Sequence, residues 1–172
     1  MNQSADLLLN LEHYRQSLCR LVADLMLKKQ FFLATAESCT GGLIAAACTD
    51  LAGSSQWFDR GFVTYSNAAK TDMLGVDAAL IAQFGAVSEQ VAAAMAQGAV
   101  KHSVAQVSVA VTGVAGPAGG TAEKPVGTVW IGWCMNGKTT TELSHFDGDR
   151  ATVRALTVQQ ALQGLVERLQ SI

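Results

Sequence analysis

Apolar positions recur with helical spacing at both ends of the chain. Between residues 6 and 29 they repeat at alternating steps of four and three, which predicts one long amphipathic helix. The repeating positions are Leu7, Leu11, Tyr14, Leu18, Leu21 and Leu25. A second stripe predicts a last helix that opens at 148–150 and continues to residue 172, and its members are Val158, Leu162, Leu165 and Leu169. We expect the first stripe to form a core face or a dimer face.

Between these two helices, short runs of apolar residues alternate with helical segments. The pattern predicts strands at 31–37, 57–65 and 107–112, and helices at 41–51, 67–74, 78–84 and 88–102. Two further strands, at 126–135 and 139–146, flank Asn136-Gly137, a dipeptide typical of a tight hairpin turn. This order predicts one α/β domain over residues 1–172, a three-layer α/β/α sandwich with a mixed, mostly parallel sheet.

Composition and charge narrow the class of protein. The 172 residues are 49% hydrophobic and carry a net charge of −2, so a core is expected and nucleic acid is not an expected partner. No run of 18 apolar residues and no signal-peptide pattern is present, so we expect a cytoplasmic protein without a membrane partner. The four cysteines and three histidines show no metal-ligand spacing, and we expect no metal and no organic cofactor.

The stretch at 36–42, Ala-Glu-Ser-Cys-Thr-Gly-Gly, joins a predicted strand to a predicted helix. A Ser38 hydroxyl at the end of a strand is exposed at the sheet edge, and the first N–H groups of a following helix point toward whatever binds there. This suits a nucleophile, with Thr40, Gly41 and Gly42 as N–H donors to an oxyanion. A plain strand–turn–helix corner with a Ser/Thr cap is the alternative.

A second polar segment follows the next predicted strand and contains Tyr65, Asn67 and Lys70. Because ligands of open α/β sheets bind beyond the carboxyl ends of the strands, we expect this segment to face Ser38. A lysine that loses its charge through desolvation can take the proton of a serine hydroxyl. No Ser-His-Asp arrangement is evident, so a Ser38–Lys70 pair is the economical choice. A solvated surface lysine and a half-buried core tyrosine are the alternatives.

A glycine-rich loop at 113–120 follows Thr112 at the end of the third strand. Glycines permit positive φ and allow backbone N–H groups to approach an anion closely, which makes Gly113, Gly116 and Gly119 candidate binding positions. The loop matches neither a dinucleotide fingerprint nor a Walker loop. A mononucleotide phosphate or a carboxamide therefore fits its size better than a dinucleotide, and a flexible turn is the alternative.

Taken together and in order, these segments resemble the CinA C-terminal domain family. The matching stretches are 37–42, 63–67, Lys70, 74–76, 112–117 and 123–129, and the resemblance spans about residues 15–170. It implies a stand-alone nicotinamide-mononucleotide deamidase, an amidohydrolase of pyridine nucleotide recycling that takes a small mononucleotide substrate. We also expect a homodimer or a higher homo-oligomer.

The resemblance also implies individual roles. Ser38 corresponds to the nucleophile, with Lys70 and Tyr65 as its activating partners. Thr112 and the glycine-rich loop match positions that line the ligand site, and Arg150 matches a substrate-contacting arginine. Ala118 departs from the family, because many relatives have glycine there.

Three alternatives stay open. Since the family includes members with weak or no deamidase activity, the chain can instead be a pyridine-nucleotide-binding or regulatory homologue. The Leu stripe of the first helix also fits a self-associating structural subunit. Cys39 is a rival nucleophile beside Ser38, although adjacent side chains point apart and only one can face a given substrate atom.

Overall fold

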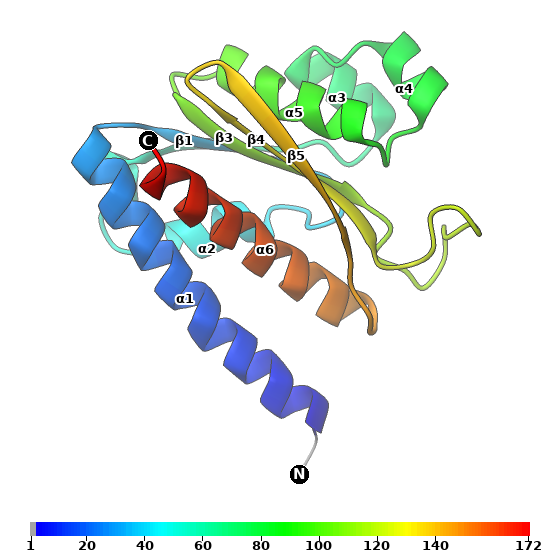
Figure 1. Ribbon diagram of the computed structural model, residues 1–172, viewed down its shortest axis with the longest axis horizontal. Helices are drawn as coiled ribbons and strands as arrows, with labels where there is room; N and C mark the ends of the chain where they lie inside the picture. Colours follow the sequence, from blue (N-terminus) through cyan, green and yellow to red (C-terminus); the bar gives the residue numbers. More distant parts are fainter. Residues whose placement is uncertain (1–2) are drawn as a thin grey trace.

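A five-stranded mixed sheet forms the centre of the protein (Figure 1). A computed structural model describes residues 3–172, and the side chains of residues 11–172. The strands are β1 (Leu33–Glu37), β2 (Phe58–Val63), β3 (Val107–Gly113), β4 (Thr128–Met135) and β5 (Lys138–His145), in the spatial order β2-β1-β3-β4-β5. β1 pairs in parallel with β2 and β3, and β4 pairs antiparallel with β3 and β5, so every strand except β4 runs in one direction. The predicted sheet is confirmed.

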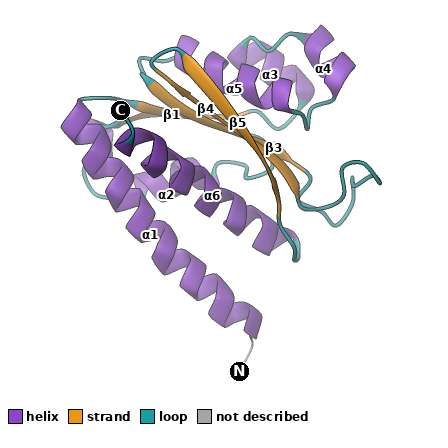
Figure 2. Ribbon diagram, in the orientation of Figure 1, coloured by secondary structure: helices purple, strands orange, loops and turns teal. Residues whose placement is uncertain are grey.

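Helices cover both faces of this sheet, which confirms the three-layer α/β/α class (Figure 2). One layer holds α1 (Gln3–Lys29), α2 (Leu43–Thr49) and α6 (Arg150–Gln170), and the other holds α3 (Asn67–Leu74), α4 (Ala78–Phe84) and α5 (Glu89–Lys101). A single 3₁₀ turn at Ser54–Gln56 precedes β2. Within residues 3–172 no helix has the length and apolar character needed to cross a membrane.

The two helical stripes have different outcomes. All four predicted positions of α6 are fully buried against the sheet. In α1, Leu18 is buried while Tyr14 and Leu21 are 46% and 45% exposed, so the stripe is only partly a core face and its role as a dimer face stays a prediction. The buried face of α1, which packs on α6, also contains Cys19, Val22 and Met26. The side chain of Leu7 lies outside the described residues.

Two glycines allow helices to approach their neighbours closely. A Cβ on Gly164 of α6 would lie 2.3 Å from the Trp133 ring, so the indole packs directly on the helix backbone. A Cβ on Gly98 of α5 would lie 2.2 Å from the Leu74 carbonyl oxygen at the end of α3. α3 therefore packs directly on the backbone of α5, and the absence of a side chain at Gly98 sets the distance between the two helices.

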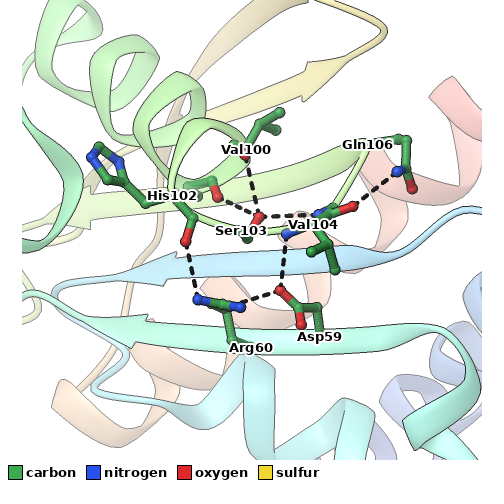
Figure 3. A network of polar contacts seen from close by, with 9 residues as sticks. Asp59, Arg60, Val100, His102, Ser103, Val104 and Gln106 are labelled. Carbon is green, nitrogen blue, oxygen red and sulfur yellow. Dashed lines mark hydrogen bonds and ion pairs between the residues drawn. The ribbon is translucent and has the colours of Figure 1, made fainter.

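A polar network ties the edge strand β2 to the turn after α5 (Figure 3). Arg60 donates from Nη1 to the His102 carbonyl oxygen at 3.1 Å and from Nε to the Asp59 carboxylate at 2.7 Å. The same carboxylate accepts from the Val104 amide at 3.3 Å. These contacts lie where β2 and β3 begin, at the opposite end of the strands from Ser38, so they hold the sheet without reaching the site described next.

Candidate active site

The Ser38 turn leaves β1 at the carboxyl edge of the sheet. The Ser38 amide donates to the Val111 carbonyl oxygen at 3.1 Å, which extends the β1–β3 pairing by one residue. The chain then reverses through Gly41 and Gly42, whose φ angles are +61° and +103°. L-residues rarely adopt such angles, so the two glycines are needed for this tight reversal and for the start of α2 at Leu43.

The carboxylate of Glu37 fills the inside of this turn. It accepts from the Thr40 hydroxyl at 2.6 Å and from the amides of Gly42, Ile44 and Ala45 at 3.1, 3.0 and 2.8 Å. The Glu37 side chain is 1% exposed. The first amides of α2 are thus already bonded within the protein, and the Gly41 amide donates to the Ser38 carbonyl oxygen at 3.1 Å.

This arrangement bears on the predicted oxyanion donors. The amides of Gly41 and Gly42 and the hydroxyl of Thr40 all have protein partners, as described above. Among the described residues, no protein oxygen accepts from the amides of Cys39 and Thr40. Thr40 is fully buried, so the amide of Cys39, one position after the serine, is the stronger candidate for a ligand donor in this turn.

Lys70 lies directly against Ser38, as the sequence predicts. Its Nζ is 3.1 Å from the Ser38 Oγ and donates to the Thr64 carbonyl oxygen at 2.9 Å. The side chain is 1% exposed, and burial lowers the pKa of Lys70 from its ordinary 10.5, with the opposing effect of the nearby Cys39 smaller. Within the described part of the chain no carboxylate forms an ion pair with this amine. A neutral amine can donate to Thr64 and accept the Ser38 proton at the same time.

Tyr65, Arg150 and the glycine-rich loop also meet. Arg150 opens α6, where the Asp149 carboxylate caps the helix by accepting from the Thr152 amide at 2.8 Å. Its Nη1 donates to the Gly116 carbonyl oxygen at 2.9 Å and its Nη2 to the Tyr65 hydroxyl at 3.0 Å. Tyr65 is 61% exposed, so it is not the half-buried core residue of the alternative interpretation.

The remaining predicted residues lie at the end of β3, in the glycine-rich loop and at the start of α3. Thr112 is 1% exposed, and its hydroxyl donates to the Ala86 carbonyl oxygen at 2.7 Å, so it joins β3 to the segment before α5. Gly113 packs against β4, where a Cβ would lie 2.7 Å from the Val129 side chain. Gly119 has a φ of +91° in the exposed part of the loop. Asn67 is exposed at the start of α3, one turn before Lys70.

Cys39 is poorly suited to act as the nucleophile. Its side chain is 6% exposed, and burial raises the pKa of the Cys39 thiol to about 11, with a further contribution from Glu37. Only on the order of one thiol in ten thousand is then ionised at neutral pH. The Lys70 amine lies 3.1 Å from the Ser38 Oγ, whereas burial keeps the neighbouring Cys39 thiol protonated.

Arg154 was missed by the sequence reasoning. It lies one helical turn after Arg150 and donates from Nη2 to the Thr40 carbonyl oxygen at 3.0 Å. A repeat of arginine at i and i+4 on the predicted last helix was the available signal. In the described residues 11–172, no three His, Cys, Asp or Glu side chains gather closely enough to hold a metal ion.

Comparison with known proteins identifies the family. A sequence model of the CinA C-terminal domain matches residues 15–169. A protein named nicotinamide-nucleotide amidohydrolase PncC, from Enterobacter agglomerans, is 56% identical over 136 residues, which are 78% of this chain and 83% of that protein. The protein of the same name from Escherichia coli K12 is 54% identical over 132 residues, 76% of this chain and 80% of its own length.

The fold is shared as well. The crystal structure of competence/damage inducible protein CihA from Agrobacterium tumefaciens superimposes with a TM-score of 0.85 at 48% identity, covering 90% of this chain and 94% of that one. The family model spans most of the described residues, and its range contains Ser38, Lys70 and Arg150. The chain belongs to the CinA C-terminal domain family.

Proposed function

We propose that the protein is an amidohydrolase that converts nicotinamide mononucleotide to nicotinate mononucleotide and ammonia. The observation that carries this proposal is the buried Lys70 amine, 3.1 Å from the Ser38 hydroxyl, in a chain 54–56% identical to amidohydrolases named for a nicotinamide nucleotide. Hydrolysis of a carboxamide needs a nucleophile, a base and donors for an oxyanion, and the Ser38 turn supplies candidates for each.

The first step is attack on the carboxamide carbon. Neutral Lys70 takes the Ser38 proton as Oγ forms the new C–O bond, and the carbonyl electrons move to oxygen. The Cys39 amide, which has no protein oxygen as a partner among the described residues, donates to that oxyanion. The C–N bond then breaks, and the Lys70 ammonium returns a proton so that ammonia leaves and an ester with Ser38 remains.

The second step is hydrolysis of the ester. Lys70, neutral again, takes a proton from a water molecule that attacks the same carbon. The C–Oγ bond breaks and the proton on Lys70 returns to Ser38. The carboxylic acid loses its proton to solvent, and the product leaves as the carboxylate. In the first step, Tyr65 relays the proton from the Lys70 ammonium to the departing ammonia, and its bond to Arg150 fixes the phenol.

The 5′-phosphate belongs with Arg150 and the glycine-rich loop. The Arg150 guanidinium already contacts the Gly116 carbonyl and the Tyr65 hydroxyl, so it joins the loop to the edge of the site. Guanidinium groups hold phosphates through charge-assisted hydrogen bonds. A phosphate at this position would orient the nicotinamide ring toward Ser38.

The test is ammonia release from four amides: nicotinamide mononucleotide, nicotinamide riboside, nicotinamide and NAD. We expect the mononucleotide to be the best substrate by kcat/KM. Tight binding of the mononucleotide without ammonia release would instead favour the catalytically weak binding homologue. Ammonia release that is equal for all four amides would contradict a mononucleotide site.

A further inference from the structure

We infer that Glu37 is a positioning residue for the reaction, because its carboxylate holds the turn that carries Ser38 in its reactive geometry. This inference rests on the proposed function for its kinetic readout. It assigns no substrate contact to Glu37, which is buried at 1% exposure beneath the turn.

The contacts of Glu37 span the whole turn. One carboxylate oxygen accepts from the Thr40 hydroxyl and from the amides of Gly42 and Ile44, and the other accepts from the Ala45 amide. The side chain thus joins the residue before Ser38 to positions up to eight residues later. The four donor–acceptor distances are 2.6–3.1 Å. Hydrogen bonds to a carboxylate are stronger than those between neutral groups, so these four restrain the turn.

Thr40 is the link through which this order reaches the reactive groups. Its hydroxyl is bound to Glu37, its carbonyl oxygen accepts from Arg154 Nη2, and it is fully buried. The Thr40 amide is therefore fixed from both sides of the residue. Since Ser38 lies between Glu37 and Thr40, a carboxylate that bonds to Thr40 restrains the Ser38 backbone as well.

The same contacts satisfy the N–H groups at the start of α2 within the protein. The Glu37 carboxylate occupies the amides that such a helix would otherwise present, and α2 is only seven residues long. A residue that sets the position of a nucleophile and of oxyanion donors acts mainly on kcat. A misplacement of about 1 Å costs up to a hundredfold in rate, while ground-state binding changes little.

The test compares Glu37→Gln with the native enzyme on nicotinamide mononucleotide. Glutamine keeps the length of the side chain, but its NH₂ group faces N–H donors and cannot accept from them. We expect kcat to fall about tenfold to a hundredfold, with KM within about twofold of native. Thr40→Val should reproduce the loss and Thr40→Ser should lose less, because only serine keeps the hydroxyl.

Two control variants separate positioning from a general loss of stability. Glu167→Gln makes the same chemical change at an exposed glutamate of α6, and Asp77→Ala removes the carboxylate that caps α4 by accepting from the Ala79 amide. Both should keep native kcat, whatever their melting temperatures. A native kcat in Glu37→Gln, a loss confined to KM, or an equal loss in Asp77→Ala would each overturn the inference.

A second measurement does not depend on the proposed function. Amide hydrogen exchange at Gly42, Ile44 and Ala45 should accelerate in Glu37→Gln and stay native in Glu167→Gln. If the native enzyme releases no ammonia from any of the four amides, the proposed function fails, and the exchange rates still test whether Glu37 holds the turn. Unchanged exchange at all three amides would refute this role of Glu37 even in an active enzyme.

Discussion

Replacement of Lys70 by arginine gives the sharpest test of the base. The Lys70 Nζ lies 3.1 Å from the Ser38 Oγ, within reach for proton transfer, and burial lowers its pKa. Arginine keeps a positive charge and hydrogen-bond donors but stays protonated at any working pH, so it cannot accept the proton. We expect Lys70→Arg to lose kcat about 10²- to 10⁴-fold, the usual contribution of a general base, or about 2.7–5.4 kcal/mol of activation free energy.

The size of the guanidinium needs its own control, because Lys70 is almost fully buried. Lys70→Met keeps the length and apolar stem of the side chain and removes the amine. It should lose as much activity as Lys70→Arg. It should also lower the melting temperature, since the Thr64 carbonyl oxygen loses its donor, a cost of about 1–3 kcal/mol for a buried group.

The assay is ammonia release from nicotinamide mononucleotide, coupled to glutamate dehydrogenase and run well below the melting temperature of each variant. Circular dichroism checks that each variant is folded. If Lys70→Arg keeps more than about a tenth of native kcat while Lys70→Met does not, the role of Lys70 is electrostatic and the base assignment is wrong.

Four further predictions follow from the site and from the packing of α3. Ser38→Ala should lower kcat by several orders of magnitude in the same ammonia assay, whereas Cys39→Ala should stay active; the reverse result would make the thiol the nucleophile. The kcat/KM of the native enzyme should rise with pH as Lys70 loses its proton, and the midpoint should lie below 10.5, because burial lowers this pKa; a pH–rate profile with a midpoint at or above 10.5 would contradict a desolvated base. Nicotinamide riboside should be about ten- to a hundredfold poorer than its 5′-phosphate by kcat/KM, and Arg150→Ala should shrink that preference, mainly through the mononucleotide; equal efficiency in the native enzyme would exclude a phosphate site. Gly98→Ala should lower the free energy of unfolding in urea by about 1–3 kcal/mol, because the new Cβ would lie 2.2 Å from the Leu74 carbonyl oxygen. Leu74 ends α3, the helix that carries Lys70, so an unchanged unfolding midpoint would show that α3 moves freely.

Local signals were sufficient for much of the fold. α3 begins after a Ser66 cap and ends at Gly75 with a φ of +68°, and α4 lies between Asp77 and Gly85, so both matched their predicted ranges. The hairpin turns at Asn136-Gly137, where both residues have positive φ. Cap and turn residues act within a few positions of the chain, so one sequence is enough to read them.

Contacts between distant elements were harder to predict. The Ser38–Lys70 contact followed from topology, because both residues come after parallel strands that end at one edge. The stripe of α1 is only partly buried, because periodicity marks the apolar positions of a helix but not which of them a neighbouring element covers. The role of Glu37 depends on the direction of its side chain, which points into the turn that follows it. The residue types at 37–42 do not indicate that direction.

The bridge made by Arg150 has a consequence for affinity. In the ligand-free protein its two terminal nitrogens are already bonded to Gly116 and Tyr65. A guanidinium carries five N–H groups, so three remain for a ligand while the bonds to Gly116 and Tyr65 stay intact. The bridge holds the guanidinium in place before a ligand arrives, so binding of the proposed phosphate there immobilises little further side-chain motion and costs little entropy.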